Sequence, residues 1–101
     1  MDLNKNFKGL NGEEVAFSQE APQVRTIAEQ ICYMLFTAQS APDRRLTKKD
    51  KWMAYQICRK ISADPSDVQL TEDERVLVEN IAGDYFIAGL FGQVVELLQQ
   101  E

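Results

Sequence analysis

The chain has 101 residues, of which 45% are hydrophobic and 27% charged, and its formal net charge is −5. This length fits one domain, and the apolar content is ordinary for a globular protein and too high for a disordered tail. The acidic balance argues against a general nucleic-acid-binding surface. Because the chain has no histidine, it lacks the commonest general base near neutral pH, and we expect no enzyme, no cofactor and no metal site.

Nothing in the sequence points to a membrane. The N-terminal stretch lacks the apolar core of a signal peptide, and the longest apolar run, residues 85–98, is shorter than a bilayer-spanning helix. We therefore expect a cytoplasmic protein, acting in the host cytoplasm if a phage encodes it, with no membrane among its partners.

The first seventeen residues predict a small β-hairpin. Two short stretches, 7–10 and 13–17, flank Asn11-Gly12, and this dipeptide favours a type I′ turn because both residues tolerate positive φ. An isolated two-stranded hairpin is marginal in water, so we expect this one to pack on the rest of the domain or on a partner.

Helical spacing of apolar residues governs the rest of the chain. Pro22 suits the first turn of a first helix, and Pro42 follows its end. Gly83 ends or kinks a third helix, and a strongly apolar fourth helix follows. The predicted fold is one mostly α-helical domain over 1–101, a small four-helix bundle-like arrangement with the N-terminal hairpin. The predicted helices are 22–39, 47–63, 71–83 and 85–99.

The second and third predicted helices begin with the same capping pattern. Thr47 with Asp50, and Thr71 with Glu74, have the spacing of capping boxes, in which the threonine and the acid each bond the other's backbone N–H. The repeat also resembles a pair of calcium loops, but Arg75 stands where calcium needs a bidentate glutamate. Repeated helix capping is the better explanation.

Two cysteines, Cys32 and Cys58, each lie next to the apolar stripe of a predicted helix. One interpretation is a disulfide or a redox pair. The other is a pair of reduced, buried core side chains, which we favour because free cysteine is among the most buried residue types.

Seven of the eleven basic residues lie between positions 44 and 60, and only Asp50 opposes them. Such a cluster suits an acidic partner or a phosphate-bearing ligand, although a solvated helix face has the same composition. Trp52 lies among these charges, where aromatic residues are typical of interface anchors, and its alternative is a core position. The predicted partner-binding residues are Arg44, Arg45, Lys48, Lys49, Trp52, Tyr55 and Arg59.

The predicted C-terminal helix is apolar around most of its circumference. Successive residues of a helix turn by about 100°, so its apolar residues cannot all face one way, and a helix that is apolar all round must be buried on several sides. We predict self-association of the chain through this helix. The alternative is that the helix is the central core element. The predicted interface residues are Tyr85, Phe86, Phe91 and Val95.

Three short motifs stand out: A-G-L-x-G-Q-V-V-E-L-L over 88–98, L-T-x-x-E over 70–74 and D-L-N-K-x-x-K-x-L-x-G over 2–12. Together they resemble small α-helical proteins encoded by tailed bacteriophages and prophages, whose functions are generally unassigned. The resemblance implies a phage context, either virion assembly or interference with a host system, and it brings no catalytic residues. The basic stretch 44–60 has no counterpart in that pattern.

The leading hypothesis is a non-enzymatic protein-binding module, a phage morphogenesis or accessory protein that acts as an oligomer. Its partners would be itself and an unidentified, acidic protein. The alternative is a phage-encoded inhibitor of host defence that binds a protein complex or sequesters a nucleotide ligand. A nucleic-acid-binding regulator ranks last, because the chain has no clear helix-turn-helix signature and the wrong net charge.

Overall fold

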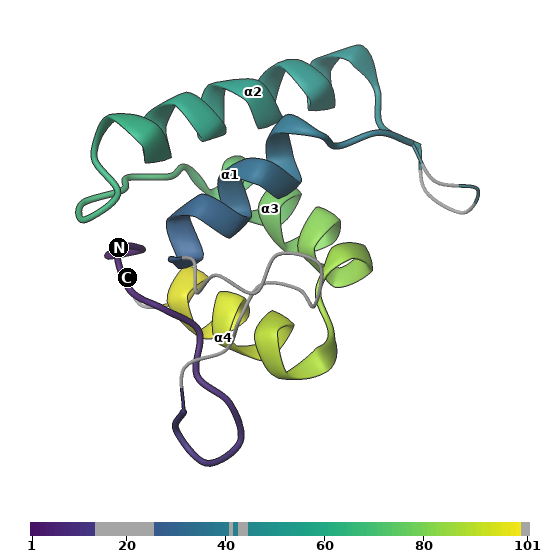
Figure 1. The fold of residues 1–101 in the computed structure, drawn as a ribbon. Coiled ribbons are helices and arrows are strands. Elements are labelled where there is room, and N and C mark those ends of the chain that lie inside the picture. The colour runs from purple at the N-terminus through teal and green to yellow at the C-terminus, as the bar shows by residue number, and fades with distance from the viewer. Residues whose placement is uncertain (14–25, 41, 43–44, 100–101) are drawn as a thin grey trace.

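Four helices make up most of the described chain. The structure is a computed structural model that describes residues 1–13, 26–40, 42 and 45–99 (Figure 1). It confirms the predicted mostly α-helical fold. Within these ranges no helix is both long enough and apolar enough to cross a bilayer. The helices are α1 (Ile27–Phe36), α2 (Lys48–Ala63), α3 (Glu72–Tyr85) and α4 (Ala88–Leu98).

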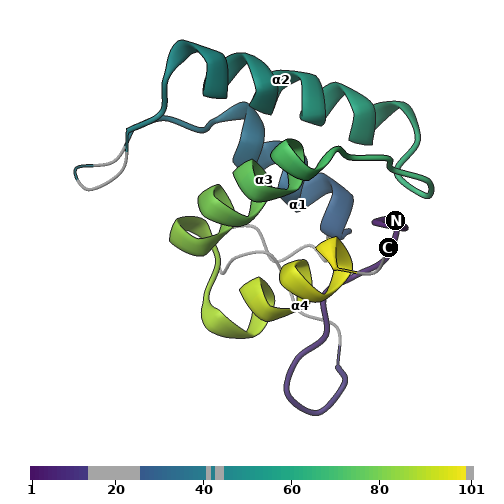
Figure 2. The ribbon, with the colours of Figure 1, turned by 180° about the vertical axis from the view of Figure 1, so that it is seen from behind.

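The longest helix, α2, lies across one side of the molecule, with α1 and α3 beneath it and α4 on the opposite side (Figure 1, and Figure 2 from behind). α1 packs against α2 and α3, and α3 also packs against α4. Apolar side chains from all four helices join Leu3 and Phe7 in one hydrophobic cluster. Because α2 covers the edge of this core, one of its sides faces the core and the other faces solvent.

Each of the first three helices begins with a capping box. The two boxes predicted from the sequence, at Thr47 and Thr71, are confirmed, and a third is present at Thr26. Each threonine hydroxyl accepts a bond from a backbone N–H three residues later, and each is worth about 1 kcal/mol. The N–H···O distances are 3.2 Å for Glu29, 3.1 Å for Asp50 and 3.2 Å for Glu74.

The bounds predicted for the first helix, 22–39, are wrong at both ends. Thr26 is extended, with φ −67° and ψ 159°, so α1 begins at the next residue. At the other end α1 stops at Phe36, where the Thr37 hydroxyl donates to the Tyr33 carbonyl at 2.8 Å. A threonine thus flanks α1 at each end: the Thr26 hydroxyl caps its first turn, and the Thr37 hydroxyl and N–H both bond the Tyr33 carbonyl.

The predicted boundary between the third and fourth helices, 71–83 and 85–99, is wrong, because the chain stays helical past Gly83 and breaks only at Phe86 and Ile87. α3 continues to Tyr85, and α4 starts at Ala88 after two extended residues. The Phe86 ring in this break packs edge-to-face on Phe7, with ring centroids 5.4 Å apart. An edge-to-face aromatic pair is worth about 0.5–1.5 kcal/mol beyond the area it buries, more than the few tenths of a kcal/mol by which helix propensities usually differ. The tertiary contact therefore explains the break.

The predicted hairpin lies partly outside the described residues, which stop at Glu13 and resume at Thr26. Gly12 has a φ of 83°, and the Gly9 N–H bonds the Glu13 carbonyl, so the chain turns at the predicted place. The described residues contain no strand, and an isolated bridge joins Asn6 to Thr26. The hairpin stays a prediction.

Residues 1–8, here called the N-terminal strap, complete the start of α1. The backbone N–H of Ile27 donates to the Lys5 carbonyl at 2.7 Å, and that of Ala28 donates to the Leu3 carbonyl at 2.9 Å. The first N–H groups of a helix have no partner within the helix. The strap therefore supplies the acceptors that α1 lacks.

The N-terminal strap also reaches two other parts of the fold. The Leu3 N–H bonds the Pro65 carbonyl between α2 and α3 at 2.8 Å. The Gln93 side chain of α4 holds Lys8 by two bonds, accepting from its N–H at 2.9 Å and donating to its carbonyl at 2.7 Å. Leu3 and Phe7 are 1% and 0% exposed, so the strap belongs to the core.

Cys32 of α1 and Cys58 of α2 meet where the two helices pack together. Each Sγ lies near the other residue's carbonyl oxygen, at 3.7 and 3.6 Å, and both thiols are free. Cys58 is buried as predicted, whereas Cys32 is half-buried. Burial raises the pKa of the Cys32 thiol to about 11, so it is protonated at neutral pH and a poor nucleophile. These properties favour the packing interpretation over the redox pair.

Candidate partner-binding face on α2

The outer side of α2 carries an aromatic and basic ridge. Lys48, Trp52, Tyr55 and Arg59 are separated by four, three and four residues, which places them on one side of the helix. All four are exposed, and we call them the α2 ridge. The residues of α2 buried against the core are Ala54, Ile57, Cys58 and Ile61.

The rings and the guanidinium of the α2 ridge contact one another. Trp52 and Tyr55 stack with ring centroids 5.8 Å apart and planes inclined by 23°. Arg59 Nη1 donates to the Tyr55 hydroxyl at 3.0 Å, and the guanidinium carbon lies 5.9 Å from the ring centroid, within cation–π range. Trp52 is nevertheless 60% exposed, and Tyr55 is 40% exposed. Trp52 is therefore not a core residue, and its role as an interface anchor stays a prediction.

An open hollow of about 560 Å³ lies beside the C-terminal part of the ridge. Trp52, Tyr55 and Arg59 contribute to its lining, together with small residues at the end of α2. It is a shallow depression open to solvent, unlike the concave clefts that bury most of a small ligand. The aromatic stack thus borders a space that a partner's side chain or a planar ligand could occupy.

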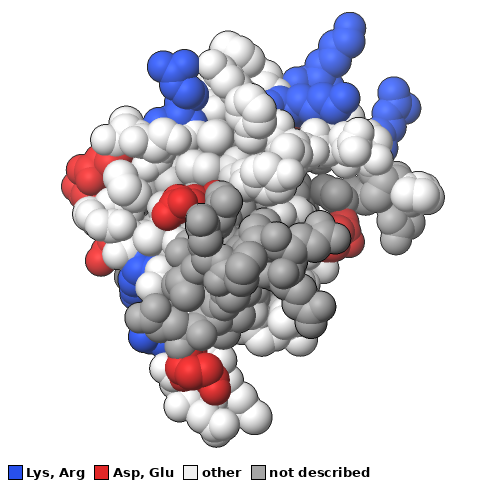
Figure 3. All heavy atoms as spheres, in the orientation of Figure 1, with Lys and Arg blue, Asp and Glu red and all other residues white. Residues whose placement is uncertain are grey.

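Basic side chains gather along the α2 side of the molecule (Figure 3). Lys48 and Arg59 end the ridge, Lys51 lies on the same helix, and all three are exposed. Within the described part of the chain, none of the three forms an ion pair. The predicted residue Arg44 lies outside the described residues.

Arg45 and Lys49 belong to a different surface. They lie along a groove of about 350 Å³ between α2 and α3, whose α3 side includes Asp73 and Val76. The structure thus divides the predicted partner-binding residues between the α2 ridge and this groove, which the sequence pattern did not separate.

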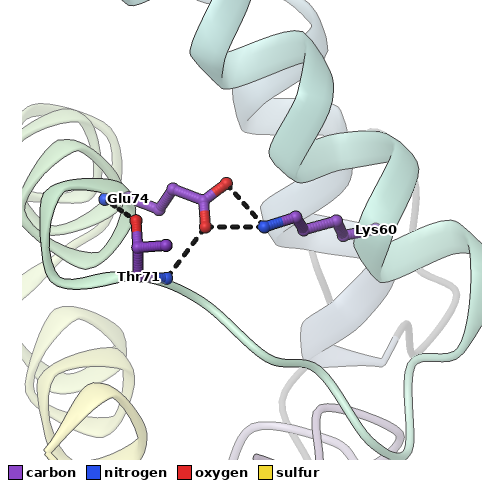
Figure 4. A network of polar contacts seen from close by, with 3 residues as sticks. All are labelled: Lys60, Thr71 and Glu74. Carbon is purple, nitrogen blue, oxygen red and sulfur yellow. Dashed lines mark hydrogen bonds and ion pairs between the residues drawn. The ribbon is translucent and has the colours of Figure 1, made fainter.

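Lys60 is bound to α3 and does not contribute a free charge (Figure 4). Its Nζ lies 2.7 and 2.9 Å from the two carboxylate oxygens of Glu74, and the Thr71 N–H donates to the same carboxylate at 2.8 Å. Burial by itself would raise the pKa of Glu74, but the bonds from Lys60 and Thr71 hold that pKa below its ordinary value. This pair links α2 to α3 and keeps the α2 ridge in place on the core.

We expect the Glu74 carboxylate to stabilise the fold above about pH 4.5, the ordinary pKa of the group. A carboxyl whose pKa is lower in the folded state adds stability above its unfolded pKa, and this stability is lost as the pH falls through the folded pKa. Glu74→Gln keeps a capping side chain but removes the charge. It should lower the free energy of unfolding at pH 7 by about 1–2 kcal/mol.

Urea unfolding between pH 3 and pH 7 tests this, with Glu79→Gln, at an exposed position of the same helix, as the control. The Glu74 variant should lose less stability than the wild type as the pH falls. Identical pH dependence in the Glu74 variant and the wild type would show that the Lys60–Glu74 pair does not hold the two helices together.

The residues predicted for self-association are only partly exposed. Phe86 and Val95 are half-buried, and Tyr85 is 40% exposed. Phe91 is half-buried beside α3, where a Cβ placed on Gly83 would lie 3.7 Å from its ring. Since Val94, Leu97 and Leu98 are also buried, α4 is largely a core element. Self-association through these four residues stays a prediction.

Comparisons with known proteins bring no relative: no family model, curated protein or solved structure matches the chain. Among the described residues, no group of three or more cysteine, aspartate or glutamate side chains is placed to hold a metal ion.

Proposed function

We propose that this chain is a non-enzymatic protein-binding module that takes an acidic partner on the α2 ridge. The observation that carries the proposal is the exposed stack of Trp52 on Tyr55, braced by Arg59. Tryptophan, tyrosine and arginine are the residues most enriched at binding hot spots. Trp52, 60% exposed, contributes little to the core, whereas covering it with a partner would gain roughly 25 cal/mol for each Å² of apolar surface buried.

The side chains of the α2 ridge are held in place before a partner binds, which favours tight binding. The stack and the Arg59–Tyr55 hydrogen bond hold three side chains in place before a partner arrives. Ordering a flexible side chain on binding costs about 0.5–1.5 kcal/mol, and the ridge avoids part of this cost. Lys48 and Lys51 add positive charge nearby, which favours an acidic partner and speeds its association.

A nucleotide ligand is the second candidate, because the same stack borders the hollow beside the ridge. Stacking of a base on an aromatic side chain is worth about 1–3 kcal/mol. Trp52 is the chain's only tryptophan, so its fluorescence reports on the ridge alone. We expect no saturable quenching by nucleoside triphosphates, and a blue shift of the emission when a protein covers the ring. Saturable quenching would favour the nucleotide.

We further propose a phage setting, in which the protein acts in the host cytoplasm as an oligomeric morphogenesis or accessory protein. This setting rests on the sequence resemblance to small phage proteins. The alternative within the same setting is inhibition of a host defence complex. Genomic neighbourhood distinguishes them, since head and tail genes would favour assembly and a defence-associated cluster would favour inhibition.

Site-specific photo-cross-linking tests the protein-binding proposal. A photoreactive residue replaces Gln56, which is exposed and lines the hollow beside the ridge, and the matched control places it at Glu79, exposed on α3. In the cells that naturally make the protein, we expect one defined cross-linked protein from position 56 that disappears when Trp52→Ala and Arg59→Glu are added. Equal cross-linking from both positions would refute the proposed face.

A further inference from the structure

We infer that the groove between α2 and α3 is a self-association surface, occupied by a second copy of this chain related by two-fold symmetry. The inference rests on the oligomeric part of the proposed function and is independent of the α2 ridge. It assigns self-association to a surface other than the four α4-region residues that the sequence suggested.

The two walls of this groove carry opposite charges. Arg45 and Lys49 line the α2 side, and Asp73 lines the α3 side. None of these three side chains forms an ion pair with another described residue. The remaining charged residue of the lining, Asp50, accepts a hydrogen bond from the Thr47 N–H at 3.1 Å as part of the α2 capping box. Among the described residues, the groove thus keeps one basic and one acidic wall whose charges form no ion pair.

Apolar side chains lie between these charged walls. Val76 is 50% exposed and Met53 is half-buried, whereas Leu46 and Leu77 line the groove as buried core residues. Stable interfaces combine an apolar centre with a polar rim. The groove therefore has the composition of an interface centre flanked by charge.

A second copy fits these walls better than an acidic partner does. An acidic partner would be attracted by Arg45 and Lys49 but repelled by Asp73. In a two-fold dimer the same patch is used twice, so the basic wall of each copy meets the acidic wall of the other copy. A standard interface buries about 800 Å² per partner, roughly an eighth of the 6553 Å² surface of this chain.

Paired charge reversals test the inference by sedimentation equilibrium and native mass spectrometry. Arg45→Glu with Lys49→Glu makes both walls acidic, and Asp73→Lys with Asn80→Lys makes both walls basic. We expect the wild type to form a dimer of twice the 11.5 kDa chain mass at high micromolar concentration. Each double variant should be monomeric, and an equimolar mixture of the two should form the heterodimer.

The mixture also controls for folding, because two misfolded chains would not restore each other. Trp52→Ala should stay dimeric, which separates this surface from the proposed partner site, and so should Tyr85→Lys near the α4 end. A wild type that is monomeric throughout, or double variants that stay homodimeric, would overturn the inference. Loss of the dimer in Tyr85→Lys would place the interface near α4 and overturn it as well.

Discussion

Phe7→Ala should lower the free energy of unfolding by about 3–5 kcal/mol, the usual loss when a buried phenylalanine is truncated. Phe7 is 0% exposed, and its ring packs on Phe86 with centroids 5.4 Å apart. The substitution therefore removes both an anchor of the N-terminal strap and the contact that explains the break between α3 and α4. For a small domain whose total stability is of order 5–15 kcal/mol, this is a severe loss.

Leu10→Ala is the matched control for Phe7→Ala. Leu10 follows the strap in the same N-terminal segment but is 100% exposed, so its truncation should change the free energy of unfolding by less than about 0.5 kcal/mol. Urea unfolding followed by circular dichroism measures both variants. If the two substitutions cost equally little, the strap is a peripheral segment and its contacts with the helices contribute no stability.

Trp52→Ala should weaken binding of the partner by at least about 30-fold, which corresponds to a hot-spot loss of about 2 kcal/mol or more. The ring is 60% exposed and stacks on Tyr55 rather than on the core, so the unfolding free energy should change little. Titration calorimetry with the protein identified by cross-linking gives the affinity, and a thermal melt gives the stability.

Phe36→Ala provides the comparison for Trp52→Ala. Phe36 is an aromatic residue on α1 that is 71% exposed and lies outside the α2 ridge. Its truncation should leave the partner's affinity within about 2-fold, the effect expected for a residue outside the hot spot. Similar losses in both variants would mean that exposed aromatic area in general, and not the α2 ridge, determines binding.

The spacing of capping residues was sufficient to predict where two helices start. Thr47 and Thr71 stand three residues before an acid, and the structure shows both capping boxes. The same spacing, Thr26 to Glu29, is present before α1. The prediction instead placed Pro22 in the first turn, which is too far upstream. A search for this spacing alone would have found the correct start, because a capping box depends on neighbours in the chain.

The solvent-facing position of Trp52 could also have been predicted from the sequence. Nine residues separate Trp52 from Ile61, so the two lie about 180° apart on a helix that turns 100° per residue. Because Ile61 belongs to the apolar stripe that faces the core, this geometry alone places Trp52 toward solvent. The structure confirms that position, and it alone shows that Tyr55 and Arg59 brace the ring.

Contacts between distant parts of the chain could not be predicted from periodicity. The Lys60–Glu74 pair and the Lys8–Gln93 bonds join different elements, and no local rule specifies such partners. The position of the break between α3 and α4 belongs to the same class, since it lies at Phe86, which packs on Phe7, and not beside Gly83 as predicted. These contacts decide which cations remain free for a partner, and so which face of α2 is available.

The most direct test of the proposed binding face is a map of backbone amide chemical shifts, recorded by NMR with and without the cross-linked partner. The proposal predicts that the largest changes fall on residues 48–59 of α2, centred on Trp52 and Tyr55, and that the α4 amides change little. Large changes confined to residues 85–95, with the amides of α2 unaffected, would contradict the proposed face.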